Sequence, residues 1–226
     1  MRGMAERMTG KGLGGRPRDA SIDTAALDAV SELLEESGYG ALAVEKVARH
    51  AGVSKTAVYR RWPTRQQLVL AELQRRLGDV APVDTGCTLC DLNEALGMFV
   101  RTFTCMGPEF FSPLLADCSA DPALRREFMD TLFEPPRQAV HTTLARAVER
   151  GDLRADADLT LVVDSLASLV HYRLLFGHAP VTDEAVEQAV TTLLAGVAHD
   201  FDALRAQAAK ADAESDHRVE HHHHPD

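Results

Sequence analysis

The chain has 226 residues, of which 45% are hydrophobic and 26% charged, the composition of a soluble globular protein with a sizeable core. No run of about 18 apolar residues and no apolar leader is present, so we expect neither a membrane span nor a secretory signal, and the cytoplasm is the expected compartment. The net charge of -10 is uneven, because residues 1–76 carry +4 and residues 77–226 carry -14. This division predicts that the first part attracts a polyanion and that the second repels it.

The hydrophobic pattern indicates helices along nearly the whole chain and no alternating strand, so the expected fold class is all-α. The turn-rich stretch 78–86 is the expected junction between a small helical domain over 21–77 and a larger one over 87–209. Residues 1–20 are expected to form a flexible basic arm, and 210–226 a disordered tail. Helices are expected between Ile22 and Gly38, at about 44–51 and 55–62, after the cap Thr64, and at about 88–105, 108–119, 122–133, 136–150, 158–177 and 182–209, with a break or kink at Pro135-Pro136.

The stretch Ser54–Leu68, SKTAVYRRWPTRQQL, is basic, aromatic and free of acid. Gly52 permits a tight turn before it, and Val58 and Trp62 are spaced to form one apolar face of a short helix. The opposite, polar face suits the major groove, which is the layout of a helix-turn-helix reader of DNA. The residues expected to contact DNA from this stretch are Ser54, Lys55, Thr56, Tyr59, Arg60, Arg61, Thr64 and Arg65.

A second basic element, GGRPRD, places Arg16 and Arg18 around a proline just before the first helix. Flexible arginine arms can enter the narrow minor groove of DNA, so both residues are added to the expected DNA contacts. Taken by itself, the element is more typical of a solvated tail than of a DNA-binding arm.

The stretch GYGALAVEKVARHAGVSKTAVYRRWPTRQQLV, within residues 21–73, resembles the DNA-binding domain of the tetracycline-repressor (TetR) family of bacterial regulators. The resemblance implies that Lys55, Thr56, Tyr59 and Arg60 lie on the recognition helix. It further implies that Arg65 holds a phosphate at the start of the next helix. Ala43 stands where family members often have a Thr or Ser that caps the preceding helix, so this helix is expected to lack a side-chain cap.

For the whole chain, the resemblance implies an N-terminal three-helix domain with a helix-turn-helix and a C-terminal helical domain for ligand binding and dimerisation. The implied function is that of a repressor that a small-molecule effector releases from its operator. The implied partners are palindromic double-stranded DNA, an unknown effector and a second copy of the chain, with no membrane involved. A helical interaction module that does not bind DNA is the alternative outside this class.

Apolar side chains in the C-terminal domain supply two candidate sites. A dimer interface is expected on the last long helices, although one intramolecular core would give the same pattern: Val162, Leu169, Val186, Val190, Leu193, Val197 and Phe201. An effector pocket is expected among apolar residues with a few polar ones: Phe99, Phe103, Phe110, Phe111, Leu115, His141, Leu144, Leu166, His171 and Tyr172. Glu109 and Asp117 are expected to be solvated.

Cys87 and Cys90 form a C-x-x-C motif, which leaves open a regulator that senses thiol oxidation or a metal. The run His221–His224 is given no function, and no metal site or cofactor is expected. The sequence contains no G-x-S-x-G, P-loop or H-E-x-x-H motif, so no catalytic residues are assigned and the protein is not expected to be an enzyme.

Overall fold

The computed structural model describes residues 20–220, and this part of the chain is helical with no strand. The N-terminal domain contains α1 (Ala20–Ser37), the short 3-10 turn η1 (Tyr39–Ala41), α2 (Val44–His50) and α3 (Lys55–Arg61). α1 buries one face against this domain, through Ala26, Ala29, Val30, Leu33 and Leu34. These positions recur every three or four residues, so the amphipathic pattern in the sequence accounts for the side of α1 that faces inward.

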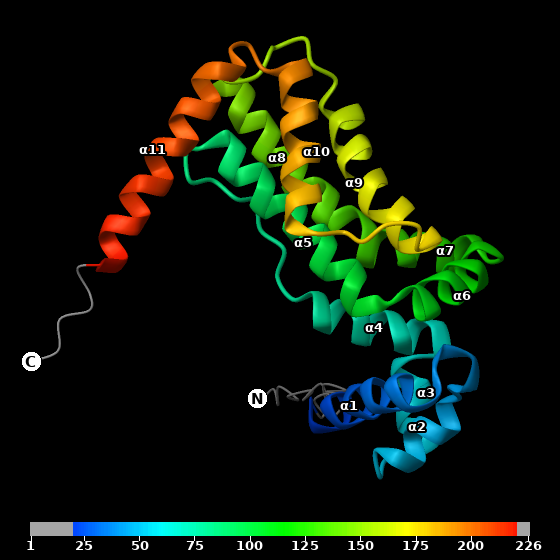
Figure 1. The fold of residues 1–226 in the computed structure, drawn as a ribbon. Coiled ribbons are helices and arrows are strands. Elements are labelled where there is room, and N and C mark those ends of the chain that lie inside the picture. Colours follow the sequence, from blue (N-terminus) through cyan, green and yellow to red (C-terminus); the bar gives the residue numbers. More distant parts are fainter. Residues whose placement is uncertain (1–19, 221–226) are drawn as a thin grey trace, which may run out of the picture.

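α4 (Arg65–Leu77) connects the two parts of the molecule. It packs against α1 on the side of the N-terminal domain and against α6, α7 and η2 on the side of the C-terminal domain. Figure 1 shows α4 lying between the helices α1–α3 and the larger C-terminal domain. Because α4 belongs to both packing layers, a shift of the C-terminal helices can reach the N-terminal domain through α4 itself.

The C-terminal domain, which we call the body, is a bundle built around α5 and α8. Its helices are α5 (Thr88–Met106), α6 (Pro108–Ser119), α7 (Pro122–Phe128), η2 (Met129–Phe133), α8 (Glu134–Glu149), α9 (Leu159–Phe176), α10 (Asp183–Val197) and α11 (Phe201–Glu220). α5 packs against α8, α9 and α10, and α11 points away from the bundle in Figure 1. By length and composition α9 could cross a membrane, and 28% of it is buried; in this structure it packs against α5, α8 and α10 of the bundle.

Three stretches differ from the sequence expectation. Of the break or kink expected at Pro135-Pro136, the break does not occur: the π-helical turn η2 interrupts the regular helix just before the prolines and leads directly into α8. The prolines occupy the first turn of α8, where a missing N–H group is tolerated. The expected helix 182–209 is divided, because Ala198 is extended and pairs with Leu153, after which Asp200 accepts a hydrogen bond from the Ala203 N–H. Helix α11 continues through residues 210–220, where disorder was expected; the alanine-rich stretch before them favours helix.

Candidate nucleic-acid interface

The turn between α2 and α3 is built by local backbone interactions. Gly52 has a φ of +65°, which side chains disfavour, and the Val53 N–H donates to the Ala48 carbonyl at 3.0 Å. Ser54 caps α3, with its Oγ accepting from the Ala57 N–H at 3.2 Å. Ala43, by contrast, supplies no side-chain cap to α2, as expected. These contacts hold α3 at a fixed angle on the surface of the domain.

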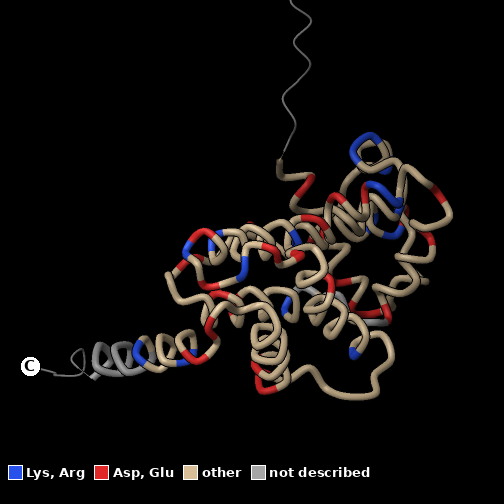
Figure 2. The backbone as a smooth tube through the Cα atoms, turned by 90° about the horizontal axis from the view of Figure 1, so that it is seen from above, with Lys and Arg blue, Asp and Glu red and all other residues tan. Residues whose placement is uncertain are grey.

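The two faces of α3 divide as the spacing predicts. Val58 is fully buried in the core of the domain and Trp62 is half-buried against it. Lys55, Thr56 and Arg60 are exposed, and Tyr59 retains 37% of its surface. In Figure 2, the largest group of Lys and Arg lies at the end of the molecule away from α11, whereas Asp and Glu are spread along the chain.

Glu45 of α2 holds the two central groups of the exposed face of α3. Its Oε1 accepts from Lys55 Nζ at 2.6 Å and from the Tyr59 hydroxyl at 3.0 Å, and Nζ lies 5.6 Å from the centre of the Tyr59 ring. The hydrogen bond from Lys55, helped by that from Tyr59, lowers the pKa of Glu45 to about 2. Glu45 therefore stays ionised and neutralises Lys55 in the DNA-free protein. No local pattern marks Glu45 as the partner of Lys55 and Tyr59; its place in the first turn of α2 is the one signal that the sequence gives.

Arg61 does not reach the exposed face. Its side chain is only 5% exposed, forms an ion pair with Asp23 of α1 and donates to the Ala57 carbonyl at 3.1 Å. The expectation that Arg61 contacts DNA is therefore wrong. Helical spacing turns Arg61 toward α1, where it joins α1 to α3.

Thr64 and Arg65 stand at the N-terminus of α4. The Thr64 Oγ1 accepts from the Gln67 N–H at 3.2 Å, so this side chain caps the helix as predicted from the sequence. Arg65 directs its guanidinium away to the body, where Nη2 lies 2.7 Å from Asp117 Oδ2. Arg16 and Arg18 lie outside the described residues.

Asp117 of α6 is the meeting point of the two domains. Its Oδ2 accepts hydrogen bonds from the Tyr39 hydroxyl at 2.7 Å, from Arg65 and from Gln66 Nε2 at 3.1 Å. The hydrogen bonds from Tyr39 and Arg65 lower the pKa of Asp117, and burial raises that of Tyr39. Asp117 was expected to be solvated; its side chain is one third exposed, and its Oδ2 is held by protein donors. We call this group of four residues the Asp117 latch.

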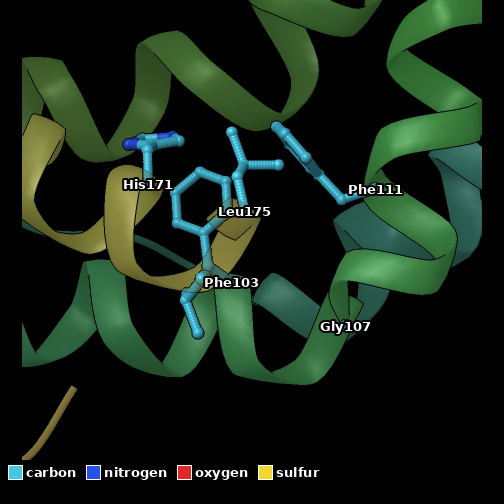
Figure 3. A pocket seen from close by; sticks show the side chains of 6 residues that line it. Phe103, Gly107, Phe111, His171 and Leu175 are labelled. Carbon is cyan, nitrogen blue, oxygen red and sulfur yellow. The ribbon is translucent and has the colours of Figure 1, made fainter. Parts of the chain in front are cut away.

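A small pocket in the body lies close to the other end of α6. It is lined by Phe103, Gly107, Phe111, His171, Leu174 and Leu175, from α5, α6, α9 and the junction between α5 and α6. The pocket has about 10 Å³ of free space, enough for a single water molecule. In Figure 3, His171 and Leu175 project from α9 toward the ring of Phe103, and Phe111 enters from α6. Three of the residues expected at an effector site, Phe103, Phe111 and His171, are therefore together.

The other residues expected at the effector site lie elsewhere. Phe99, Leu144 and Leu166 are buried in the core, and Phe110 and Leu115 are half-buried against it. His141 lines a separate, polar depression between α8 and α9, and Tyr172 is 58% exposed beside Phe176 and His178. Gly107, Leu174 and Leu175 were missed, because nothing local in the sequence indicates that the end of α9 faces the end of α5.

The expected dimer interface divides in a similar way. An exposed groove between α9 and α10 includes Leu169 and Leu193 among its lining residues. Val162, Val186 and Val190 are at most 6% exposed within the protomer, so they are core residues and not contacts for a partner. Val197 and Phe201 are half-buried beside that core.

Cys87 and Cys90 form a disulfide at the start of α5, where the interdomain junction enters the body. Cys87 is also the cap of α5, its Sγ accepting from the Cys90 N–H. Within residues 20–220 no group of three or more His, Cys, Asp or Glu side chains is placed to hold a metal ion. His221–His224 lie outside the described residues.

Comparisons with known proteins agree with this architecture. Residues 26–71 match the family described as bacterial regulatory proteins, tetR family, and residues 82–193 match the tetracyclin repressor-like C-terminal domain. The regulator AqdR of Rhodococcus erythropolis is 30% identical over 184 residues, which cover 79% of this chain and 86% of AqdR. The DNA-binding transcriptional repressor TetR of Mycobacteroides abscessus is 29% identical over 182 residues, 80% of this chain and 93% of the relative.

A solved structure extends the comparison to three dimensions. The TetR family transcription regulator SCO0332 is 33% identical, with a TM-score of 0.62, over 78% of this chain and 98% of its own. Both domains, their order and the helix-turn-helix therefore agree with one family. The chain belongs to the TetR family of transcriptional regulators, which bind DNA.

Proposed function

We propose that this regulator represses transcription as a homodimer in the cytoplasm, and that a small molecule bound in the body releases it from a palindromic operator. The DNA-binding part of this proposal is supported above all by the exposed polar face of α3, on which Glu45 holds Lys55 and Tyr59 side by side. A helix of this kind reads base edges in the major groove and contacts phosphates with its basic side chains. Lys55, Thr56, Tyr59 and Arg60 are the proposed contacts on α3.

Arg65 can contact a DNA phosphate only if its guanidinium leaves Asp117. In the DNA-free protein its guanidinium is held by a carboxylate of the body at 2.7 Å. A phosphate and Asp117 would therefore compete for the same donor group. This competition is part of the proposed link between the two domains.

Helix α6 supplies the coupling between effector and DNA in this proposal. Phe111 in its first turn lines the pocket, and Asp117 near its last turn belongs to the latch. A ligand that displaces Phe111 would shift α6, and the latch would transmit the shift to α4 and η1. The ligand then needs only to favour the arrangement in which the two recognition helices no longer fit successive grooves.

The groove between α9 and α10 supports the proposal that the regulator is a dimer. Its lining combines the apolar Leu169 and Leu193 with small or polar neighbours, Ala185, Ala189 and Thr192. A symmetric partner would lay its own α9 and α10 on this surface and form a four-helix interface. Two recognition helices would then face half-sites about one helical turn, or ~34 Å, apart or a multiple of it.

The test of the DNA-binding proposal is fluorescence anisotropy with DNA fragments from the regulator's own gene neighbourhood. Lys55→Ala and Tyr59→Ala are expected to weaken specific binding at least tenfold while the dimer persists in analytical ultracentrifugation. Lys210→Ala removes the same charge from an exposed position on α11 and is the matched control. Specific binding that is unchanged in both α3 variants would contradict the proposed face.

A second candidate function, regulation by thiol oxidation, is favoured by the Cys87–Cys90 disulfide. The pair lies where the junction is held to the body, next to Thr85, whose N–H and hydroxyl donate to Asp91 at 2.8 and 2.6 Å. The reaction is an exchange with a small disulfide: one thiolate attacks it and releases the first small thiol, and the second cysteine displaces the other. The two protein thiols are oxidised and the small disulfide is reduced.

The redox function requires that operator affinity differ between protein treated with glutathione disulfide and protein treated with dithiothreitol. The difference should disappear in the Cys87→Ser/Cys90→Ser variant and persist in Cys118→Ser. Cys118 is a suitable control because it is a buried free thiol whose burial raises its pKa to about 11. Equal affinities in the two treatments, with oxidation of the pair verified by mass spectrometry, would eliminate this function.

A further inference from the structure

His171 has one ring nitrogen that the protein satisfies and one that it does not. Nδ1 lies 2.6 Å from the Ala167 carbonyl oxygen, one turn earlier in α9. A carbonyl can only accept, so this contact assigns the hydrogen to Nδ1. In the neutral ring, Nε2 is then an acceptor, and it is buried without a hydrogen-bond partner. Unsatisfied buried polar atoms are uncommon in proteins and often mark the place of a ligand or a water.

The surroundings of His171 are aromatic. The ring centres of Phe103, Phe133 and Phe111 lie 3.9, 5.4 and 6.2 Å from that of His171, and they come from α5, η2 and α6. Burial lowers the pKa of His171, which keeps the ring neutral at physiological pH. The acceptor at Nε2 is therefore available in the form of the protein that operates in the cell.

The lining of the pocket also limits the charge of a ligand. Its six residues include neither Lys nor Arg, and His171 is the only polar side chain among them. An anionic ligand would lose its hydration there without gaining a cation, which is costly. A ligand that presents only acceptors would face the lone pair of Nε2. The remaining match is a neutral, mainly apolar molecule with one O–H or N–H group.

The pocket must open to admit such a molecule, because its present free space holds about one water molecule. Leu175 is the side chain that can yield, since it is 41% exposed at the end of α9. Gly107, with a φ of +58°, is the single residue that joins α5 to α6, so α6 can pivot there. Entry between Leu175 and Phe111 would thus move the helix that carries Asp117.

We propose that the pocket binds a neutral aromatic molecule of the phenol class, which stacks among Phe103, Phe111 and Leu175 and donates its hydroxyl hydrogen to Nε2 of His171. This inference rests on the proposed function for its consequence, release from DNA, but not for the binding itself. It identifies the chemical class of the effector and the residue that selects it.

The test uses three probes of similar shape: 4-propylphenol, 4-propylanisole and 4-propylbenzoate. Isothermal titration calorimetry of the full-length protein without DNA is expected to give the tightest binding for the phenol. The anisole, which lacks the donor, and the benzoate, which is an anion, should each bind roughly tenfold or more weakly, because Nε2 stays unpaired in one case and the charge is desolvated in the other.

His171→Phe tests the role of the acceptor, because it keeps an aromatic ring and removes Nε2. In this variant the phenol and the anisole should bind with similar affinity. Tyr172→Phe, at the exposed neighbouring position, is the matched control and should retain the wild-type preference. Circular dichroism verifies that both variants are folded. Phe103→Leu tests the aromatic lining: its affinity for all three probes should fall, while the preference for the phenol over the anisole remains.

Each outcome is informative. Equal binding of phenol and anisole by the wild-type protein, binding of none of the three, or a preference that persists in His171→Phe would overturn the inference. Operator binding is measured separately by anisotropy with and without 4-propylphenol. If the phenol binds through His171 and the operator complex is unaffected, the ligand assignment stands and the proposed release mechanism fails. If no operator is bound at all, the DNA-binding proposal fails independently of the ligand.

Discussion

Replacing Asp117 with Asn tests the latch between the domains. Tyr39, Arg65 and Gln66 all donate to Oδ2. The amide oxygen of Asn can take that place, but it carries no negative charge, and the NH2 group beside it cannot accept from these donors. The side chains of Asp117 and Arg65 are 33% and 35% exposed, so solvent reduces the ion pair to about 0.2–1 kcal/mol. The hydrogen bonds from the neutral donors, Tyr39 and Gln66, weaken as well, which costs about 1 kcal/mol more. Together, the two effects should lower the free energy of unfolding by about 1–2 kcal/mol.

The loss should depend on pH with a defined sign. Hydrogen bonds from Tyr39 and Arg65 lower the pKa of Asp117 in the folded protein. Its contribution to stability is therefore present above the ordinary carboxyl pKa of about 3.9 and is lost as the pH falls through the lowered value. The difference between wild type and Asp117→Asn should be full at pH 7 and should shrink below about pH 4.

The assay is urea unfolding followed by circular dichroism, with melting curves as a second measure. A loss of 1–2 kcal/mol corresponds to a melting temperature lower by about 2–8 °C for a chain of this size. Asp130→Asn, which removes an exposed carboxylate from η2, is the control and should change stability little. If Asp117→Asn matched the control at pH 7, or if its loss were the same at low pH, the latch would not join the domains as we describe.

The Asp117→Asn variant also tests whether Arg65 contacts DNA. Once Asp117 no longer holds the guanidinium, Arg65 is free to meet a phosphate, so the slope of log affinity against log salt should steepen by about 0.9. The double variant Asp117→Asn/Arg65→Ala should lose this gain. An unchanged slope in the single variant would mean that Arg65 does not reach the DNA backbone.

Three further substitutions test individual contacts. Glu45→Gln frees Lys55 and removes a negative charge from the proposed DNA-binding face. The affinity for non-specific DNA, measured by anisotropy, should therefore rise up to about eightfold near 0.1 M salt. Weaker binding would show that Glu45 itself contributes to DNA affinity. Arg61→Ala should lower the free energy of unfolding by about 2–3 kcal/mol, less than a fully buried pair because Asp23 is 34% exposed, and should leave the salt slope unchanged. Glu72→Ala removes a buried carboxylate that accepts from two arginines of α4, and urea unfolding should reveal a loss of about 1–3 kcal/mol.

The helix-turn-helix could be predicted well because its determinants are local. The turn at Gly52, the cap at Ser54 and the spacing of Val58 and Trp62 act within a few residues, and the structure confirms each of them. The predicted helix boundaries were wrong where a helix end is set by a contact with distant backbone. Ala198, for example, leaves the helix because it pairs with Leu153. A local sequence pattern cannot predict a pairing between residues that are 45 positions apart.

The sequence by itself determined the all-helical class, the DNA-reading helix and the division of charge, because periodicity, caps and composition act along the chain. Only the tertiary structure decided what each polar group does. It turned Arg61 toward α1, gave Arg65 to a carboxylate on α6, and placed His171 among aromatic rings from three other elements. These partners are far apart in sequence, and packing alone fixes which of the many available charges and rings meet. The proposed DNA-reading face could thus be located from local pattern, whereas the latch and the proposed ligand pocket required the packed molecule.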